Sequence, residues 1–331
     1  MKADLLKRLF KGIYAEDIIS LKKIANLIIE EERKLGHGKL ADSLVHISAT
    51  EKPRFTSLGN TNTYGNASTG VSTLPTSKRN NSQLVSFVPR ELLKHHMVLP
   101  PDVENRLQSI EKEYAARDRL SKYNLAPKKK ILLHGSPGCG KTLSAERIAW
   151  KLGLPLLKVR FDALLSSYFG ESASNLRSVF DYCNKEPVVL LLDECDFIAK
   201  SRITNQDVGE VPRIVNMLLT LLDEYNAPGL VIATTNLRIT LDEALFRRFD
   251  DVIEIPMPEI AERQELLKMT FSAISVDASV DFRSIAEKME GYSYANIVLT
   301  AQRAAKYGVL AGNRSVEQSH FEQAIAEGSK F

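Results

Sequence analysis

Short apolar runs alternate with amphipathic segments through the middle of the chain, and this alternation predicts the fold. The runs are "KKKILLHG", "LPLLKVRF", "PVVLLLD", "GLVIATTN" and "DVIEI", and helix-like segments separate them. Strands that are apolar throughout are typical of a parallel sheet covered by helices on both faces. The strand-like runs stop at Pro258, and about four helical patterns follow as far as Phe331. We therefore predict an α/β domain over residues 89–257 and an all-helical domain over residues 258–331.

The first 88 residues indicate a smaller and looser region. Apolar residues recur at helical spacing in "AEDIISLKKIANLIIEEERKLG", namely Ile18, Leu21, Ile24, Leu27 and Ile28. A second short helix is expected in "KLADSLVHI", so residues 1–47 are predicted to form a small helical appendage. Residues 48–88 shift to Ser, Thr, Asn and Gly, a mixture that buries too little apolar surface to offset the entropy of ordering it. We predict that this segment is a flexible linker.

Composition narrows the class of protein. The chain has 331 residues, of which 44% are hydrophobic, so it can bury a sizeable core. No apolar run approaches the ~20 residues that cross a bilayer, and the start "MKADLLKRLFKGIY" lacks the centre of a secretory signal. These features predict a cytoplasmic protein with no membrane partner. The three cysteines lack metal-ligand spacing and are expected as reduced thiols. A net charge of +3 is too small to argue for a nucleic-acid partner.

The segment "GSPGCGKT" matches the phosphate-binding pattern G-x-x-x-x-G-K-[ST]. It follows the strand "KILLH" and opens the helix "KTLSAERIAWKL", which is the context that the pattern requires. Glycines let backbone amides approach phosphate oxygens, and the helix N-terminus adds positive potential. Lys141 is predicted to reach the β- and γ-phosphates of ATP, and the hydroxyl of Thr142 to bind Mg²⁺. The predicted nucleotide-binding residues are Gly135, Ser136, Pro137, Gly138, Cys139, Gly140, Lys141 and Thr142. Cys139 is interpreted as a small residue tolerated in the loop, whose oxidation could block the site.

Polar side chains end two of the later apolar strands. Asp193 and Glu194 end the run "VVLLLDECD", so one carboxylate can hold the magnesium shell while the next faces the γ-phosphate and activates water. Asn236 ends the run "VIATTN", and its amide is expected to orient the attacking water. Arg247 and Arg248 end the short helix in "LDEALFRRFD". Adjacent arginines are usually surface charge, but here they could reach the nucleotide of a neighbouring subunit as arginine fingers.

These motifs, in this order, resemble the AAA+ superfamily, and most closely its AAA branch, which includes katanin, spastin and the ATPase modules of bacterial AAA proteases. The resemblance covers roughly Pro101 to Phe331. It implies a P-loop NTPase sheet of the ASCE type with a C-terminal helical lid. It also implies ATP hydrolysis with Mg²⁺ in a homo-oligomeric ring, expected to be a hexamer, in which Arg247 and Arg248 act across the subunit interface.

Two segments depart from the family pattern. Members commonly have "RPGRF" where this chain has "RRF", which leaves the principal arginine finger undecided. The segment "GYSYANI" resembles the start of the family's lid helix, with Asn296 where an aspartate is usual. Adenine is expected near this lid turn and near the segment from Tyr123 to Leu125.

The segment "SSYFGES" falls where family members carry an aromatic loop that faces a central pore. The resemblance implies that Tyr168 and Phe169 grip an extended polypeptide by apolar contact. Ser167 stands where a lysine is frequent. The alternative is that both rings are buried against the lid or the next helix.

The leading functional hypothesis is an ATP-driven motor that unfolds proteins by threading them through the pore. The alternatives are a DNA-associated motor or loader and a slow, nucleotide-switched scaffold. No H-E-x-x-H motif or nucleophile set occurs in the chain, so any proteolysis would need a separately encoded protease subunit.

Overall fold

The computed structural model describes residues 24–30, 33, 42, 74–77, 82–165, 171–196, 210–236, 243–272, 274–311 and 315–328. These residues form two compact units. The sheet unit contains residues 71–266 and 283–299, and the helical unit contains residues 267–282 and 300–331 together with the described part of residues 1–70. Helices α12 (Ile260–Thr270) and α14 (Tyr294–Leu310) begin in the sheet unit and end in the helical unit. Residues 283–299, which the sequence assigned to the all-helical domain, thus group with the sheet.

The sheet unit is built on a mostly parallel sheet, as predicted. The described strands follow the order β1-β3-β4-β5-β2-β6, and only the β1–β3 pair is antiparallel. Their bounds are β1 (Val85–Val88), β2 (Lys130–His134), β3 (Leu156–Val159), β4 (Val189–Leu192), β5 (Leu230–Thr235) and β6 (Asp251–Glu254). The register pairs His134 with Thr235 and Leu192 with Ala233, so β2, β4 and β5 end at the same edge. This edge carries the candidate site.

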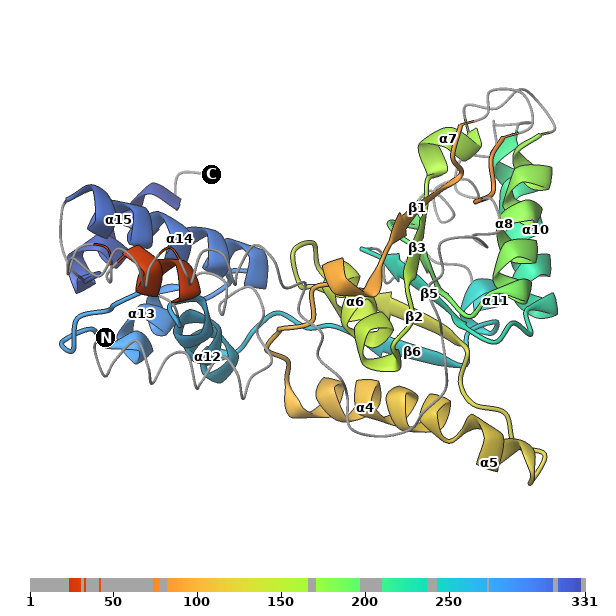
Figure 1. Cartoon of the computed structure of the whole chain (residues 1–331), viewed down its shortest axis with the longest axis horizontal. Helices are drawn as coiled ribbons and strands as arrows, with labels where there is room; N and C mark the ends of the chain where they lie inside the picture. The colour runs from red at the N-terminus through yellow and green to blue at the C-terminus, as the bar shows by residue number, and fades with distance from the viewer. Residues whose placement is uncertain are drawn as a thin grey trace. The chain divides into compact units, whose positions relative to one another are not determined.

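Helices cover both faces of the sheet. Figure 1 shows α8 and α10 on one side of it and α4 and α6 on the other. The helices and the 3₁₀ turn of this unit are the turn Arg90–Leu92, α4 (Pro101–Ala115), α5 (Arg117–Ser121), α6 (Lys141–Leu152), α7 (Phe161–Leu165), α8 (Ser172–Lys185), α10 (Glu210–Glu224) and α11 (Glu243–Phe246). Most of α13 (Phe282–Lys288) also belongs to it. Strands β4 and β5 are buried along their whole length, as expected for strands between two helical layers.

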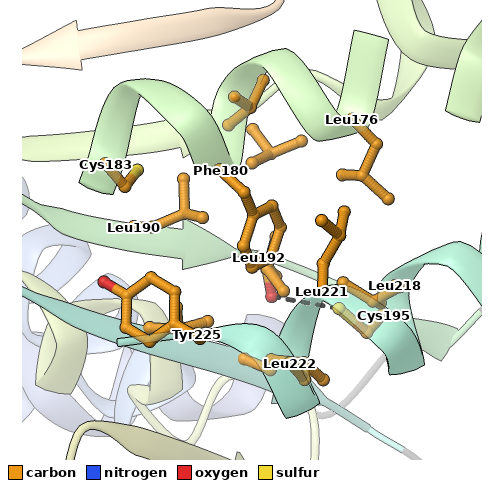
Figure 2. Packing of buried hydrophobic residues seen from close by; sticks show 14 of the residues in the cluster. Leu176, Phe180, Cys183, Leu190, Leu192, Cys195, Leu218, Leu221, Leu222 and Tyr225 are labelled. Carbon is orange, nitrogen blue, oxygen red and sulfur yellow. Dashed lines mark hydrogen bonds between the residues drawn. The ribbon is translucent and has the colours of Figure 1, made fainter. Parts of the chain in front are cut away.

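The core beneath α8 and α10 follows from helical spacing. The side chains of Leu176, Val179, Phe180 and Cys183 lie on one face of α8 and are buried. Figure 2 shows several of them packed with residues of β4 and α10. The rings of Phe180 and Tyr225 pack in a T-shaped arrangement with their centroids 6.0 Å apart. All three cysteines are free and buried, and burial raises the pKa of the Cys183 thiol to about 12.

The helical unit has its own aromatic core. Phe321 of α15 (Gln318–Gly328) is fully buried, and its ring centroid lies 5.0 Å from that of Phe271 and 6.2 Å from that of Phe282. Val276 and Val316 form an isolated parallel bridge in the same unit. None of the helices in the described part of the chain is long and apolar enough to cross a membrane.

The predicted linker over residues 48–88 is too long at its C-terminal end. Residues 85–88 form β1, the edge strand that pairs with β3, and Thr76 bridges to Gln83 just before it. Leu84 and Val85 are completely buried. The short apolar run "LVSFV" contributes to the sheet because β3 supplies its hydrogen-bond partners. This long-range pairing has no local sequence signal, and the residues around the run are polar.

The predicted apolar face of the N-terminal helix is partly wrong. Residues 24–30 are helical and Ile24 is buried, but Leu27 is 41% exposed and Ile29 is buried at 8%. Ile18 and Leu21 lie outside the described residues, as do Tyr168 and Phe169. Helical spacing alone did not identify which of the two adjacent isoleucines in "NLIIEE" is buried.

Candidate functional site

The predicted phosphate loop connects β2 to α6, and its glycines are required by its backbone. Gly135 has a φ of +150° and Gly138 a φ of +78°, conformations that side chains disfavour. A Cβ atom on Gly135 would lie 2.2 Å from the carbonyl oxygen of Ile255, and one on Gly138 would lie 2.7 Å from the Oγ of Ser293. The loop therefore needs glycine at both positions to fit between β6 and the start of α14.

Lys141 opens α6, and its ammonium turns back into the loop. The Nζ atom donates hydrogen bonds to the carbonyl oxygens of Gly135 at 2.8 Å and Ser136 at 2.9 Å, and to the Oδ1 of Asn236 at 2.8 Å. Burial lowers the pKa of Lys141, and nearby groups that include Asp196 oppose this effect. A buried ammonium with three neutral oxygen partners is suited to an anionic ligand such as a phosphate group.

Thr142 and Asp193 bring the loop and the end of β4 together. The hydroxyl of Thr142 donates to the Oδ1 of Asp193 at 2.9 Å, and the hydroxyl of Thr234 donates to the same oxygen at 2.6 Å. The Nζ of Lys158 lies 2.6 Å from the other oxygen, Oδ2. Burial raises the pKa of the Asp193 carboxyl, but the hydrogen bonds from Lys158, Thr234 and Thr142 outweigh burial and hold it below its usual range. Asp193 therefore places a buried, ionised carboxylate beside the phosphate loop.

Glu194 has a strained backbone that exposes its carboxylate. Its φ is +57°, which is uncommon for a residue with a side chain. Two hydrogen bonds to Thr234 hold this turn: the amide of Glu194 donates to the hydroxyl at 2.9 Å, and the amide of Cys195 donates to the carbonyl oxygen at 2.8 Å. The Glu194 side chain is exposed, whereas the next residue is buried. The turn thus directs one carboxylate into solvent at the sheet edge.

Asn236 lies between Lys141 and Asp196. Its side-chain nitrogen donates to Asp196 Oδ2 at 2.9 Å, and its backbone amide donates to Asp196 Oδ1 at 2.9 Å. The hydroxyl of Thr235 donates to that same Oδ1 at 2.7 Å. Burial raises the pKa of the Asp196 carboxyl, but the hydrogen bonds from Thr235 and Asn236 outweigh burial and hold the pKa below its usual range. Asp196 therefore fixes which way the Asn236 amide points.

The two arginines occupy the turn between α11 and β6. Arg248 is partly buried, and its Nε lies 3.0 Å from the Oδ2 of Asp223 on α10. Arg247 is exposed. The two side chains thus differ in their exposure to solvent, a difference that the adjacent letters "RR" do not reveal.

The start of α14 lies directly against the phosphate loop. The amide of Ala295 donates to the carbonyl oxygen of Gly138 at 3.1 Å. Tyr294 is buried, and its hydroxyl makes no hydrogen bond with the described residues. By contrast, Tyr123 and Leu125, the other segment expected near adenine, are 78% and 58% exposed.

Cys139 is enclosed within the loop. Its Sγ lies 3.4 Å from the Sδ of Met257, and the residue is 1% exposed. Burial raises the pKa of this thiol, and Lys141 opposes the shift. A buried, protonated thiol reacts slowly with oxidants, so the structure argues against ready oxidation at this position.

Four residues of the site were not predicted from the sequence: Lys158, Thr234, Thr235 and Asp196. Because β4 and β5 are parallel neighbours, the residues just beyond β4 meet the last residues of β5, which brings Asp193 to Thr234 and Asp196 to Thr235. The paired threonines of "IATTN" and the last acid of "DECD" were the available signal. Lys158 gave no local signal, since it is a single charged residue within an otherwise apolar strand.

Comparison with known proteins identifies the class. The profile of the ATPase family associated with various cellular activities (AAA) matches residues 131–257. An uncharacterized AAA family ATPase of Sinorhizobium fredii, y4kL, is 32% identical over 329 residues, which are 99% of this chain and 96% of the relative. The chain belongs to the AAA family, and the predicted P-loop fold and ATPase activity are confirmed.

Two further relatives are proteasome-activating nucleotidases. That of Methanosphaerula palustris is 33% identical over 229 residues, covering 67% of this chain and 56% of the relative. That of Methanosarcina mazei is 30% identical over 239 residues, covering 70% and 57%. The chain therefore spans little more than half the length of these nucleotidases.

Proposed function

We propose that this ATPase is a protein-remodelling motor that unfolds polypeptides, working as a hexameric ring. The observation that carries the proposal is the hydrogen-bonded chain that runs from Lys141 through Asn236 to Asp196, beside an exposed Glu194. A complete hydrolytic set favours a motor that turns over ATP rather than a slow scaffold. The similarity to two proteasome-activating nucleotidases favours protein as the substrate.

In this proposal each polar group of the sheet edge has one role in hydrolysis. The loop from Gly135 to Thr142 binds the phosphates through backbone amides, and Lys141 neutralises their charge. Glu194 accepts a proton from the attacking water, and Asn236 orients that water. The strained backbone of Glu194 supports this role because it keeps the carboxylate at the open edge of the sheet, in reach of a ligand.

Thr142 and Asp193 fit a magnesium ion. A hydroxyl oxygen and an ionised carboxylate oxygen lie 2.9 Å apart at the end of the phosphate loop, and both are the hard oxygen ligands that Mg²⁺ prefers. When bound with ATP, the ion would neutralise charge on the phosphates. Thr142 and Asp193 would hold it, while Thr234 keeps the Asp193 carboxylate in place.

The ring is needed because the arginines act between subunits. Arg247 and Arg248 would reach the nucleotide of the neighbouring copy, and the greater exposure of Arg247 favours it as the group presented to the neighbour. Tyr168 and Phe169 would grip the polypeptide in the pore. A separate protease subunit could receive the unfolded chain.

The substrate class is tested by adding candidate polymers to the purified ATPase. We expect an unstructured polypeptide to raise the rate of ATP hydrolysis by about two- to fivefold, because a motor turns over faster while it pulls, and double-stranded DNA to leave it unchanged. Stimulation by DNA but not by polypeptide would support a DNA-associated motor instead. A slow rate that neither polymer changes would support the scaffold. Sedimentation of Glu194→Gln with ATP tests the hexamer.

A further inference from the structure

Lys158 stands out because nothing in the hydrolytic scheme uses it, although it contacts Asp193 directly. It lies in β3, next to β4, and its Nζ is 2.6 Å from Asp193 Oδ2. The Asp193 side chain is 8% exposed and the Lys158 side chain 45%. A half-exposed cation therefore neutralises a buried carboxylate that the proposed magnesium site also needs.

The hydrogen bonds around Asp193 divide its two oxygens between different partners. Oδ1 accepts from Thr142 and Thr234, which hold the carboxylate on the side of the phosphate loop. Oδ2 accepts from Lys158. Each carboxylate oxygen can accept two hydrogen bonds, so the bond from Lys158 does not use the full acceptor capacity of Oδ2. The effect of Lys158 on a divalent cation is electrostatic, because two positive charges then share one carboxylate.

Lys158 lines an open pocket together with Asp193. A pocket of about 270 Å³ opens beside it, and Ser86, Arg160 and Glu194 are among its lining residues. Glu194 offers a second carboxylate on the wall of this pocket. Arg160 is paired with Asp162 at 2.9 Å, so Lys158 is the cation of the pocket that contacts Asp193.

We infer that Lys158 is a positioning residue that sets the magnesium requirement of the site: it orients the Asp193 carboxylate when no metal is bound, and its charge opposes metal binding. The inference rests on the proposed magnesium site. It makes two predictions about the chain's own residues. Removing the charge should tighten Mg²⁺ binding, and it should destabilise the protein where no metal can replace the lost counter-ion.

The experiment compares Lys158→Met with Lys158→Arg, which retains the charge, and with Arg160→Met. The Arg160 side chain is 42% exposed, so this control removes an equally exposed charge from the same pocket without touching Asp193. The affinity of each protein for a fluorescent ADP analogue is measured against the free Mg²⁺ concentration. Melting temperatures are measured in EDTA, and again with Mg²⁺ and ADP.

We expect the Mg²⁺ concentration that gives half of the change in ADP affinity to fall about three- to tenfold in Lys158→Met. This is the effect of removing one partly screened charge near a divalent ion. That concentration should stay within about twofold of the parent in the other two variants. In EDTA, Lys158→Met should melt about 2–4 °C below the parent, and Mg²⁺ with ADP should remove the difference.

An unchanged Mg²⁺ midpoint in Lys158→Met would overturn the inference, as would an equal shift in Arg160→Met. If the ADP affinity of the parent does not depend on Mg²⁺ at all, the magnesium site itself fails, and the inference fails with it. The parent titration therefore separates these two failures.

Discussion

Lys141 and Asn236 are joined by a hydrogen bond of 2.8 Å between the ammonium and the side-chain amide oxygen. Lys141 opens α6 and Asn236 follows the last residue of β5, so the bond connects the phosphate loop to a strand 95 residues away in the chain. Asp196 holds the amide from the other side. The loop, the sheet edge and the acidic segment after β4 thus form one polar network.

Asp196 is expected to act through Asn236. Asp196→Ala removes both acceptors that orient the amide, so we predict that kcat falls about 10- to 100-fold. The affinity for ADP should change less than about threefold, since the phosphate loop is intact. The matched control is Asp162→Ala, which removes an exposed acid. A loss of ADP affinity as large as the loss of kcat would show instead that Asp196 supports the loop as a whole.

Glu194→Gln should separate binding from chemistry. The substitution keeps the size of the side chain and removes its capacity to accept a proton, so we predict normal ATP binding with hydrolysis at least ~100-fold slower. Single-turnover kinetics and equilibrium binding measure the two effects. Hydrolysis within about tenfold of the parent would exclude Glu194 as the general base.

Asp251 should stabilise the sheet unit in a pH-dependent way. It is buried and bonded to Lys128 at 2.9 Å and to Arg106. Burial raises the pKa of its carboxyl, but these two cations lower it below the ordinary value of 3.8. Because its pKa is lower in the folded state than in the unfolded state, the ionised Asp251 carboxylate stabilises the fold at pH values above the unfolded-state pKa. This stabilisation is lost as the pH falls through the folded-state pKa.

We therefore predict that Asp251→Asn lowers the free energy of unfolding by about 1–3 kcal/mol at pH 7. The difference from the parent should shrink as the pH falls from about 4 toward 2. Urea unfolding at several pH values measures it. A difference that is constant across this range would mean that packing, and not charge, accounts for the loss.

Phe180 should be a major contributor to the core under α8. The side chain is 2% exposed and packs against Tyr225, so Phe180→Ala should cost about 3–5 kcal/mol of unfolding free energy. Phe87→Ala is the matched control, because Phe87 lies on the edge strand and is 45% exposed. Equal losses in the two variants would contradict the assignment of the core.

The sequence predicted the parts of the fold whose signals are local. Apolar runs identified β2 to β6, and the glycine spacing identified the phosphate loop between β2 and α6. It did not predict β1, because Val85–Val88 becomes a strand only through pairing with β3. It also did not predict that residues 283–299 group with the sheet unit, because the contact of Ala295 with Gly138 joins residues that are 157 positions apart.

The same distinction between local and long-range signals applies to the residues of the site. Lys141, Thr142, Asp193 and Asn236 were predicted as site residues, and the structure brings them into contact. Lys158 and Asp196 were missed because their roles depend on which strands are neighbours, and a linear motif does not carry that information. The difference in exposure between Arg247 and Arg248 likewise depends on how the chain folds around them and not on the linear motif.

The measurement that tests the central claim most directly is the unfolding of a tagged fluorescent protein in the presence of ATP. We predict that the parent ATPase abolishes the fluorescence of the tagged protein as long as it hydrolyses ATP. The Glu194→Gln variant is predicted to leave the tagged protein folded. Tyr168→Ala, which removes the proposed grip without altering the nucleotide site, should retain basal ATPase activity and a parental melting temperature while losing unfolding at least ~10-fold. A parent that hydrolyses ATP at full rate and leaves every tagged substrate folded would contradict the account, as would a Tyr168→Ala variant that unfolds substrate at the parental rate.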